Sequence, residues 1–208
     1  MNFKNGLPPV LQAGSSDIFK NVYFVFVRSH KFFANSYETG SLRKFHLGRT
    51  EIIRASSYDS CEFVKSMNTK EAQNKSAKLF LKAASTHRAN ITNVVNGKSF
   101  DRHLFGLYLI ALENNLEFPD YLRDVYFRRS SNYHLATSNT SSQTDSVFAM
   151  GPLDNEDMNC YGCVYNIKEN KIIFGLTSFK SSSKASLREF KNQLEISLMD
   201  CKNLITIH

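Results

Sequence analysis

The chain has 208 residues, which suits one domain or one lobe of a larger protein, and 42% of them are hydrophobic, enough for a core. Its net charge of +7 is typical of proteins that bind nucleic acid, an anionic membrane surface or an anionic small ligand. Its basic residues are scattered, with no run of five or more, which disfavours nucleic acid and a polybasic membrane contact.

The chain begins with a segment rich in Gly and Pro, residues 1–15, that we expect to be loosely ordered. Residues 18–33 are apolar and rich in Val and Phe, and fit either a helix capped by Asp17 or a strand. The start lacks the pattern of a signal peptide, and the longest early hydrophobic run, residues 24–27, is too short to span a bilayer. We therefore expect a reducing, intracellular compartment, free thiols and no transmembrane segment.

Residues 37–56 are the least ordinary stretch, because four cations are interleaved there with hydroxyl groups. The pattern predicts two extended pieces, residues 37–45 and 49–55, joined at Leu47-Gly48. A core strand would be more apolar. We expect this hairpin to hold cations and hydroxyls in fixed positions.

Apolar periodicity predicts helices over residues 59–67, 70–95, 102–114 and 183–204. Gly97 is expected to end the second helix, and Asp101 to start the third. A short helical turn is expected from Pro119 through residues 125–127.

After residue 130 the apolar period changes to that of strands, over residues 133–137, 146–150, 160–167 and 171–178. Glu169-Asn170 fits a hairpin turn. Helices first, strands later and a closing helix indicate an α/β or α+β domain.

Cys160 and Cys163 have the spacing of zinc and redox sites, but no second pair of ligands is evident. We interpret them as two thiols in or beside a strand. The six histidines lie in no recognisable nucleophile or metal motif, so each is interpreted as a core or surface residue.

Three further residues leave alternatives open. Arg102, at a helix start, is either a solvated charge or a guanidinium that binds a carboxylate. Thr137 and Ser138 follow a strand, and are either strand-end hydroxyls or donors to a developing oxyanion. Composition alone does not decide between these alternatives.

Several segments, in this order along the chain, resemble those of the carnitine/choline acyltransferase family, and most closely its carnitine acetyltransferase branch. They are Tyr37-Glu-Thr-Gly-Ser-Leu-Arg-Lys-Phe, His46-Leu-Gly-Arg-Thr-Glu-Ile-Ile-Arg, Phe100-Asp-Arg-His-Leu-Phe-Gly-Leu, Leu135-Ala-Thr-Ser-Asn, Gly151-Pro, Tyr161-Gly-Cys-Val-Tyr-Asn and Glu195-x-Ser-Leu-x-Asp200.

The resemblance implies transfer of a short acyl group between coenzyme A, as co-substrate, and the hydroxyl of carnitine, with no bound cofactor. It implies an α/β fold, a chloramphenicol acetyltransferase-like lobe with a mixed β-sheet packed with helices. Residues 16–208 would be the C-terminal lobe of such a domain. The family's catalytic histidine lies in an N-terminal lobe that this chain lacks, so we expect a fragment or a degenerate paralogue.

The partners implied are carnitine, acyl-coenzyme A and the missing lobe, without nucleic acid, in a mitochondrial or peroxisomal setting. The alternative is a non-catalytic lobe that binds carnitine or another protein. A lobe built to pack against a second one should expose an apolar face, so we expect the isolated chain to self-associate.

The resemblance also implies roles for individual residues. Tyr37, Thr50 and Arg102 match the positions that bind the carnitine carboxylate, a phenol, a hydroxyl and a guanidinium around one anion. Choline enzymes have Val and Asn in place of the last two, so carnitine is favoured. Glu38 and Thr39 match positions near the pantetheine arm of coenzyme A. The remaining arginines of the hairpin, Arg54 among them, are interpreted as structural or solvent-facing.

Ser138 matches the last serine of the family's Ser-Thr-Ser motif, which stabilises the oxyanion, and Ala136 replaces the first. Met150 stands where a Phe packs against the trimethylammonium group. Phe148 replaces the Gly of medium- and long-chain enzymes and the Met of the acetyl enzyme, which implies a pocket for short acyl groups.

Overall fold

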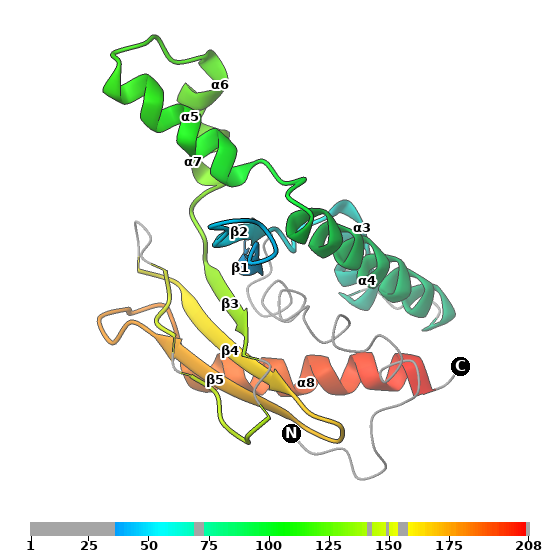
Figure 1. The fold of residues 1–208 in the computed structure, drawn as a ribbon. Coiled ribbons are helices and arrows are strands. Elements are labelled where there is room, and N and C mark those ends of the chain that lie inside the picture. Colours follow the sequence, from blue (N-terminus) through cyan, green and yellow to red (C-terminus); the bar gives the residue numbers. More distant parts are fainter. Residues whose placement is uncertain (1–35, 69–72, 141–142, 149, 154–157, 207–208) are drawn as a thin grey trace.

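The computed structural model describes residues 36–68, 73–140, 143–148, 150–153 and 158–206 (Figure 1). The predictions for residues 1–15 and 18–33 lie outside these ranges.

The centre of the fold is a mixed sheet of five strands in the order β2-β1-β3-β4-β5. The strands are β1 Ser36–Ser41, β2 Thr50–Ile53, β3 Leu135–Asn139, β4 Tyr161–Ile167 and β5 Ile172–Ser178. Antiparallel hairpins form the two sides, β1 with β2 and β4 with β5, and β3 joins them by pairing parallel with both β1 and β4. The protein is therefore an α/β fold with a mixed sheet.

The β1–β2 hairpin turns where the sequence predicts it. Leu42 and Arg49 close the turn through a backbone hydrogen bond of 3.0 Å from Leu42 N to Arg49 O. A Cβ atom on Gly48 would lie 1.9 Å from the carbonyl oxygen of Leu42, so only glycine fits this position. The predicted hairpin is present, but its strands are shorter than predicted, because β1 ends at Ser41 rather than near residue 45 and β2 ends at Ile53.

Six helices are described: α3 Tyr58–Asn68, α4 Gln73–Val95, α5 Asp101–Glu113, α6 Asp120–Arg123, α7 Val125–Arg129 and α8 Leu187–Thr206. Gly97 follows α4 at φ +70°, as expected of a helix stop. The last helix begins later than predicted because Ser182 accepts backbone hydrogen bonds in a turn, and Ser186 instead accepts from Glu189 N at 3.3 Å.

The predicted strand over residues 146–150 is wrong for its described residues. Residues 143–148 and 150–153 are irregular, and their carbonyls accept from side chains of the sheet rather than from a neighbouring strand. Asn166 Nδ2 donates to the carbonyls of Thr144 and Ser146, and Thr177 donates to that of Met150. The apolar residues of this segment reflect packing on the sheet and not membership of it.

One face of the sheet, called the covered face below, packs against helices. Leu135, Tyr161, Cys163 and Tyr165 form a buried cluster with Phe190 and its neighbours on α8, which runs beneath β4 and β5 in Figure 1. At the other end α4 approaches β1, where a Cβ on Gly40 would lie 2.4 Å from Val94 Cγ1. A second cluster joins α3 to α4.

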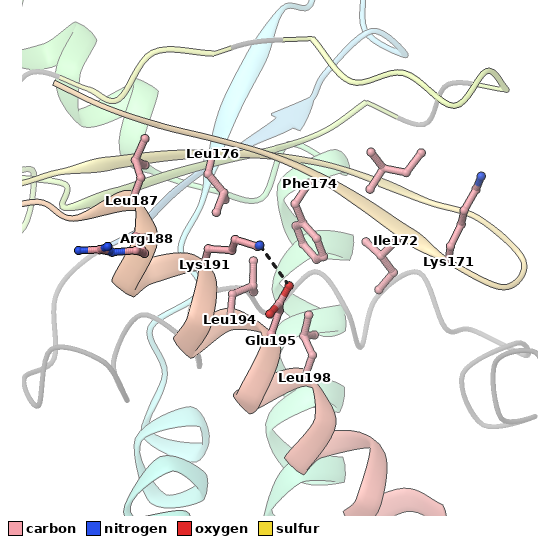
Figure 2. A pocket seen from close by; sticks show the side chains of 11 residues that line it. Lys171, Ile172, Phe174, Leu176, Leu187, Arg188, Lys191, Leu194, Glu195 and Leu198 are labelled. Atoms are coloured by element: carbon pink, nitrogen blue, oxygen red, sulfur yellow. Dashed lines mark ion pairs between the residues drawn. The ribbon is translucent and has the colours of Figure 1, made fainter. Parts of the chain in front are cut away.

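A groove of about 660 Å³ runs between β5 and α8 (Figure 2). Ile172, Phe174 and Leu194 line it, and Lys191 and Glu195 lie 3.9 Å apart along α8 on its rim. This groove belongs to the covered face.

Helices α5 to α7 form an arm that projects from the body (Figure 1), and none of their residues is buried. Large apolar side chains are exposed along it: Phe105, Leu107, Tyr108, Leu109, Ile110, Leu112, Tyr121, Val125 and Tyr126. The expected exposed apolar face is present here. Among the described helices, none has the length and hydropathy that crossing a bilayer requires.

Candidate functional site

Strand register gathers the predicted site residues on the second face of the sheet, called the open face below. Side chains alternate between faces along a strand, and partners on neighbouring strands share a face. Tyr37 pairs with Ala136, and Ser41 pairs with Thr50. Ser138, two residues beyond Ala136, therefore lies on the same face as Tyr37, Thr39 and Thr50. Tyr37, Thr39 and Ser138 are half-buried, and Thr50 is exposed.

Glu38 is the exception among the predicted site residues, because it lies on the covered face and is 4% exposed. Its carboxylate accepts 2.8 Å hydrogen bonds from Thr137 Oγ1 and from the Tyr165 hydroxyl. Burial, with the charge of Glu38 adding to it, raises the pKa of the Cys163 thiol far above its ordinary value. This placement gives Glu38 a structural task in the core and separates it from Thr39.

Tyr37, in β1, is half-buried, and its ring packs against the segment that precedes β3. Its ring meets that of Tyr133 edge to face, with centroids 5.7 Å apart. Thr39 Oγ1 donates to its phenol oxygen over a long 3.5 Å, so the Tyr37 side chain leans along β1 toward Thr39. That direction leads toward Ser41, and so toward Thr50.

Arg102 lies at the start of α5, which Glu51 of β2 holds in place. The buried carboxylate of Glu51 accepts from the backbone N–H of Arg102 at 3.2 and 3.3 Å, and from that of Ile52 at 2.7 Å. A carboxylate at a helix N-terminus is stabilising because it satisfies N–H groups and complements the helix dipole. The predicted start of α5 is confirmed, although Asp101 provides no side-chain cap.

Asp101 instead forms an ion pair with Arg54. Arg54 Nε lies 3.1 Å from both carboxylate oxygens of Asp101, and Nη1 donates to the carbonyl of Ser130 at 3.0 Å. Burial alone would lower the pKa of Arg54, but the hydrogen bond to Asp101 and the nearby acidic groups outweigh it and raise the pKa. Arg54 is therefore structural, one of the two roles expected for it.

Tyr133 links the Tyr37 side of the site to α5. Burial raises the pKa of its phenol, and the charges of Arg54, Asp101 and Arg102 and the Tyr37 phenol act on it as well. Arg54 Nη2 donates to the Tyr133 hydroxyl over a long 3.5 Å and also pairs with Asp101, the residue before Arg102. Tyr133 therefore lies between Tyr37 and the start of α5. Sequence patterns gave no signal for Tyr133 or Glu51, because each acts through contacts with residues distant in the chain.

Thr50 lies at the exposed end of this neighbourhood. On one side, its chain neighbour Glu51 accepts a hydrogen bond from the backbone of Arg102. On the other side, Thr50 pairs with Ser41 of β1. Ser41 lies four residues along β1 from Tyr37, so their backbones are roughly 13 Å apart. The lean of the Tyr37 phenol shortens that gap. Within the described residues, neither the Thr50 hydroxyl nor the Arg102 guanidinium makes a hydrogen bond. Both donors are therefore available to an anion.

Met150 approaches the open face over β4. A Cβ on Gly162 would lie 2.6 Å from the carbonyl oxygen of Met150, so glycine is needed for this close approach. Gly162 pairs with Ala136, which pairs with Tyr37, so Met150 lies about two strand spacings, roughly 10 Å, from Tyr37. Phe148 extends outward over β5 with 75% of its side chain exposed.

The described histidines give Ser138 no base. His46 and His103 are exposed, His87 is buried in α4, and Nδ1 of His134 lies 2.9 Å from the carbonyl oxygen of Asn159. None of them hydrogen-bonds to Ser138. Cys160 and Cys163 are buried thiols beside and within β4, as interpreted from the sequence. No described cluster of His, Cys, Asp or Glu has the arrangement of a metal site.

Comparison with known proteins matches the sequence over most of its length. The family model of Choline/Carnitine o-acyltransferase matches residues 23–196. Carnitine O-acetyltransferase of Homo sapiens is 36% identical over 174 residues, which cover 83% of this chain and 27% of that protein. Choline O-acetyltransferase of Danio rerio is 31% identical over 183 residues, 87% of this chain and 28% of that protein. The chain thus spans about a quarter of the length of these relatives.

Proposed function

Because this chain belongs to the choline/carnitine O-acyltransferase family, we propose that it is the carnitine-binding part of a carnitine O-acyltransferase. In that reaction a short acyl group passes between the sulfur of coenzyme A and the hydroxyl of carnitine. The observation that supports this most is that Tyr133 connects Tyr37 to the start of α5 through Arg54 and Asp101, with the Arg102 guanidinium available to a carboxylate.

The carboxylate of carnitine would lie at the end of the open face bordered by β2 and α5. Tyr37 and Thr50 would donate hydroxyl hydrogen bonds to it, and Arg102 would contribute the charge-assisted ones. Choline has no carboxylate and would leave these donors without a partner, so a site of this composition favours carnitine. The trimethylammonium group would pack against Met150, whose thioether is polarisable.

The reacting carbonyl would lie near Ser138. As the hydroxyl of carnitine attacks the thioester carbon, charge develops on the carbonyl oxygen, and the Ser138 hydroxyl would donate to it. Thr39, on the same face of the neighbouring strand, would contact the pantetheine arm of coenzyme A. Glu38 would support both strands from the covered face, through Thr137 and Tyr165. Phe148 would limit the acyl pocket once a further surface encloses it.

The general base would come from outside this chain. In this proposal residues 16–208 act as the C-terminal, chloramphenicol acetyltransferase-like lobe, preceded by loosely ordered residues 1–15. An N-terminal lobe would supply the catalytic histidine and cover the apolar arm. The second candidate is a lobe that binds carnitine or another protein without catalysis.

Calorimetry with L-carnitine and with choline tests the proposal. The chain should bind carnitine more tightly than choline, and Arg102→Ala should weaken carnitine binding about tenfold or more, as expected for loss of a charge-assisted hydrogen bond. Arg49→Ala, which removes an exposed arginine of the same hairpin, is the matched control and should leave binding unchanged.

Equal binding of carnitine by the Arg102→Ala and unsubstituted chains would overturn the carboxylate site. Release of thiol from acetyl-coenzyme A, measured with carnitine, separates the two candidates. An acyltransferase lobe should gain this activity when a relative's N-terminal lobe is added, whereas a non-catalytic lobe should not.

A further inference from the structure

Two carboxylates flank Arg102, and neither is paired with its guanidinium. Glu51 accepts from two backbone N–H groups, those of Ile52 and Arg102, and Asp101 is held by the guanidinium of Arg54. In the described part of the chain the Arg102 guanidinium itself has no ion-pair partner. A guanidinium beside an unengaged carboxylate can form a charge-assisted, bidentate pair with it.

The Arg54–Asp101 pair is built as a fixed feature of the fold. The Asp101 side chain is only 9% exposed and that of Arg54 26% exposed. Arg54 is also anchored by the carbonyl of Ser130, and its guanidinium lies 5.9 Å from the centre of the Tyr133 ring. These contacts come from two separate segments, the start of α5 and the connection between α7 and β3, so the guanidinium is confined to one position.

We propose that Arg54 is a positioning residue, which keeps Arg102 available to the substrate by holding and neutralising Asp101. The inference rests on the proposed carnitine site and deepens it. Without Arg54, the carboxylate of Asp101 would either turn toward Arg102 or stay beside it as an unneutralised negative charge. In both cases an incoming carboxylate would lose attraction to the site, while a ligand with only a positive charge would lose none.

A rescue experiment tests this assignment by calorimetry with carnitine and choline. Arg54→Met should weaken carnitine binding about tenfold, the size expected of one unneutralised charge within several ångströms in a partly buried site. Choline should bind Arg54→Met as well as before or better. The double variant Arg54→Met/Asp101→Asn should recover carnitine affinity to within about twofold of the unsubstituted chain, because the competing charge is gone.

The rescue distinguishes positioning from a structural role. If Arg54 only stabilised the start of α5, Arg54→Met would weaken both ligands, and Asp101→Asn would not restore carnitine binding. That result overturns the inference and leaves the carnitine site intact. If the unsubstituted chain binds no carnitine, both the proposed function and this inference fall. Should Arg54→Met not fold, Arg54→Lys takes its place, with a smaller loss expected because lysine keeps the charge but not the two-pronged geometry.

Discussion

Tyr37 and Tyr165 lie on strands of the same sheet but on opposite faces, and their surroundings differ accordingly. The Tyr165 hydroxyl is fully buried and donates to Glu38 at 2.8 Å. The Tyr37 phenol is half-exposed, and its described hydrogen bond is the long one from Thr39. The covered face thus uses its polar groups within the protein, whereas the part of the open face around β1 and α5 keeps its hydroxyls and the Arg102 guanidinium accessible.

The difference between the faces shows how one strand serves both stability and binding. Along β1 the side chains of Tyr37 and Thr39 point to the open face, and that of Glu38 points to the covered face. Each bond that Glu38 makes beneath the sheet fixes the backbone that carries Tyr37 above it. We expect substitutions on the covered face to change the free energy of unfolding, and those on the open face to change ligand binding.

The largest effect should come from the apolar layer of the covered face. Phe190 of α8 is 1% exposed and stacks on Tyr161 with ring centroids 4.6 Å apart. Phe190→Ala should lower the free energy of unfolding by about 3–5 kcal/mol, because it removes a buried ring and leaves a cavity. The measurement is urea denaturation followed by circular dichroism.

Phe148→Ala is the matched control for Phe190→Ala, since Phe148 lies over the open face with 75% of its side chain exposed. It should change the free energy of unfolding by less than about 0.5 kcal/mol. Similar losses for the two variants would show that the contrast between the faces is wrong.

A smaller effect is expected from the two tyrosines. Tyr165→Phe removes the hydroxyl that donates to Glu38 and leaves a buried carboxylate oxygen with one partner fewer. It should cost about 1–3 kcal/mol of unfolding free energy and leave carnitine binding unchanged. Tyr37→Phe should cost less than about 0.5 kcal/mol and weaken carnitine binding by about tenfold.

Urea denaturation of both tyrosine variants measures the change in unfolding free energy, and calorimetry measures the change in carnitine binding. The contrast fails if Tyr37→Phe destabilises the fold as much as Tyr165→Phe does, or if Tyr165→Phe weakens carnitine binding as much as Tyr37→Phe does.

Much of the fold follows from local sequence. The turn at Leu47-Gly48, the end of α4 at Gly97 and the hairpin at Glu169-Asn170 all rest on short-range backbone chemistry, and all three are confirmed. Residues 146–150 mislead because an apolar segment packed flat on a sheet has the same composition as a strand. Only the long-range bonds from Asn166 and Thr177 separate the two cases.

The candidate site was only partly predictable for the same reason. Strict alternation along β1 already places Glu38 opposite Tyr37 and Thr39, so its covered position was readable once the strand was known. The carboxylate cap by Glu51 and the Arg54–Asp101 pair join residues about fifty positions apart. No periodicity encodes such contacts, since they depend on where α5 leaves the sheet.

The smallest effect should come from charge on the helices that cover the sheet. Asp59 of α3 forms an ion pair with Lys82 of α4 at 2.8 Å and accepts from Thr86 at 2.6 Å. The hydrogen bonds from Lys82 and then Thr86 lower the pKa of Asp59 in the folded state. A lowered folded pKa means that the charged form stabilises the fold. That contribution is complete above the unfolded pKa, about 4, and is lost as the pH falls through the folded pKa.

Asp59→Asn should therefore be less stable than the unsubstituted chain at pH 7, and the difference should shrink and vanish as the pH falls below about 4. Urea denaturation at several values between pH 7 and pH 3 measures it. Glu62→Gln, which removes the exposed pair of Glu62 with Lys65 inside α3, should change stability little at any pH. A difference for Asp59→Asn that stays constant with pH would mean that the side chain acts through packing. The charge of Asp59 would then contribute nothing to the stability of the fold. The helices α3 and α4 would be held together by the burial of their apolar side chains.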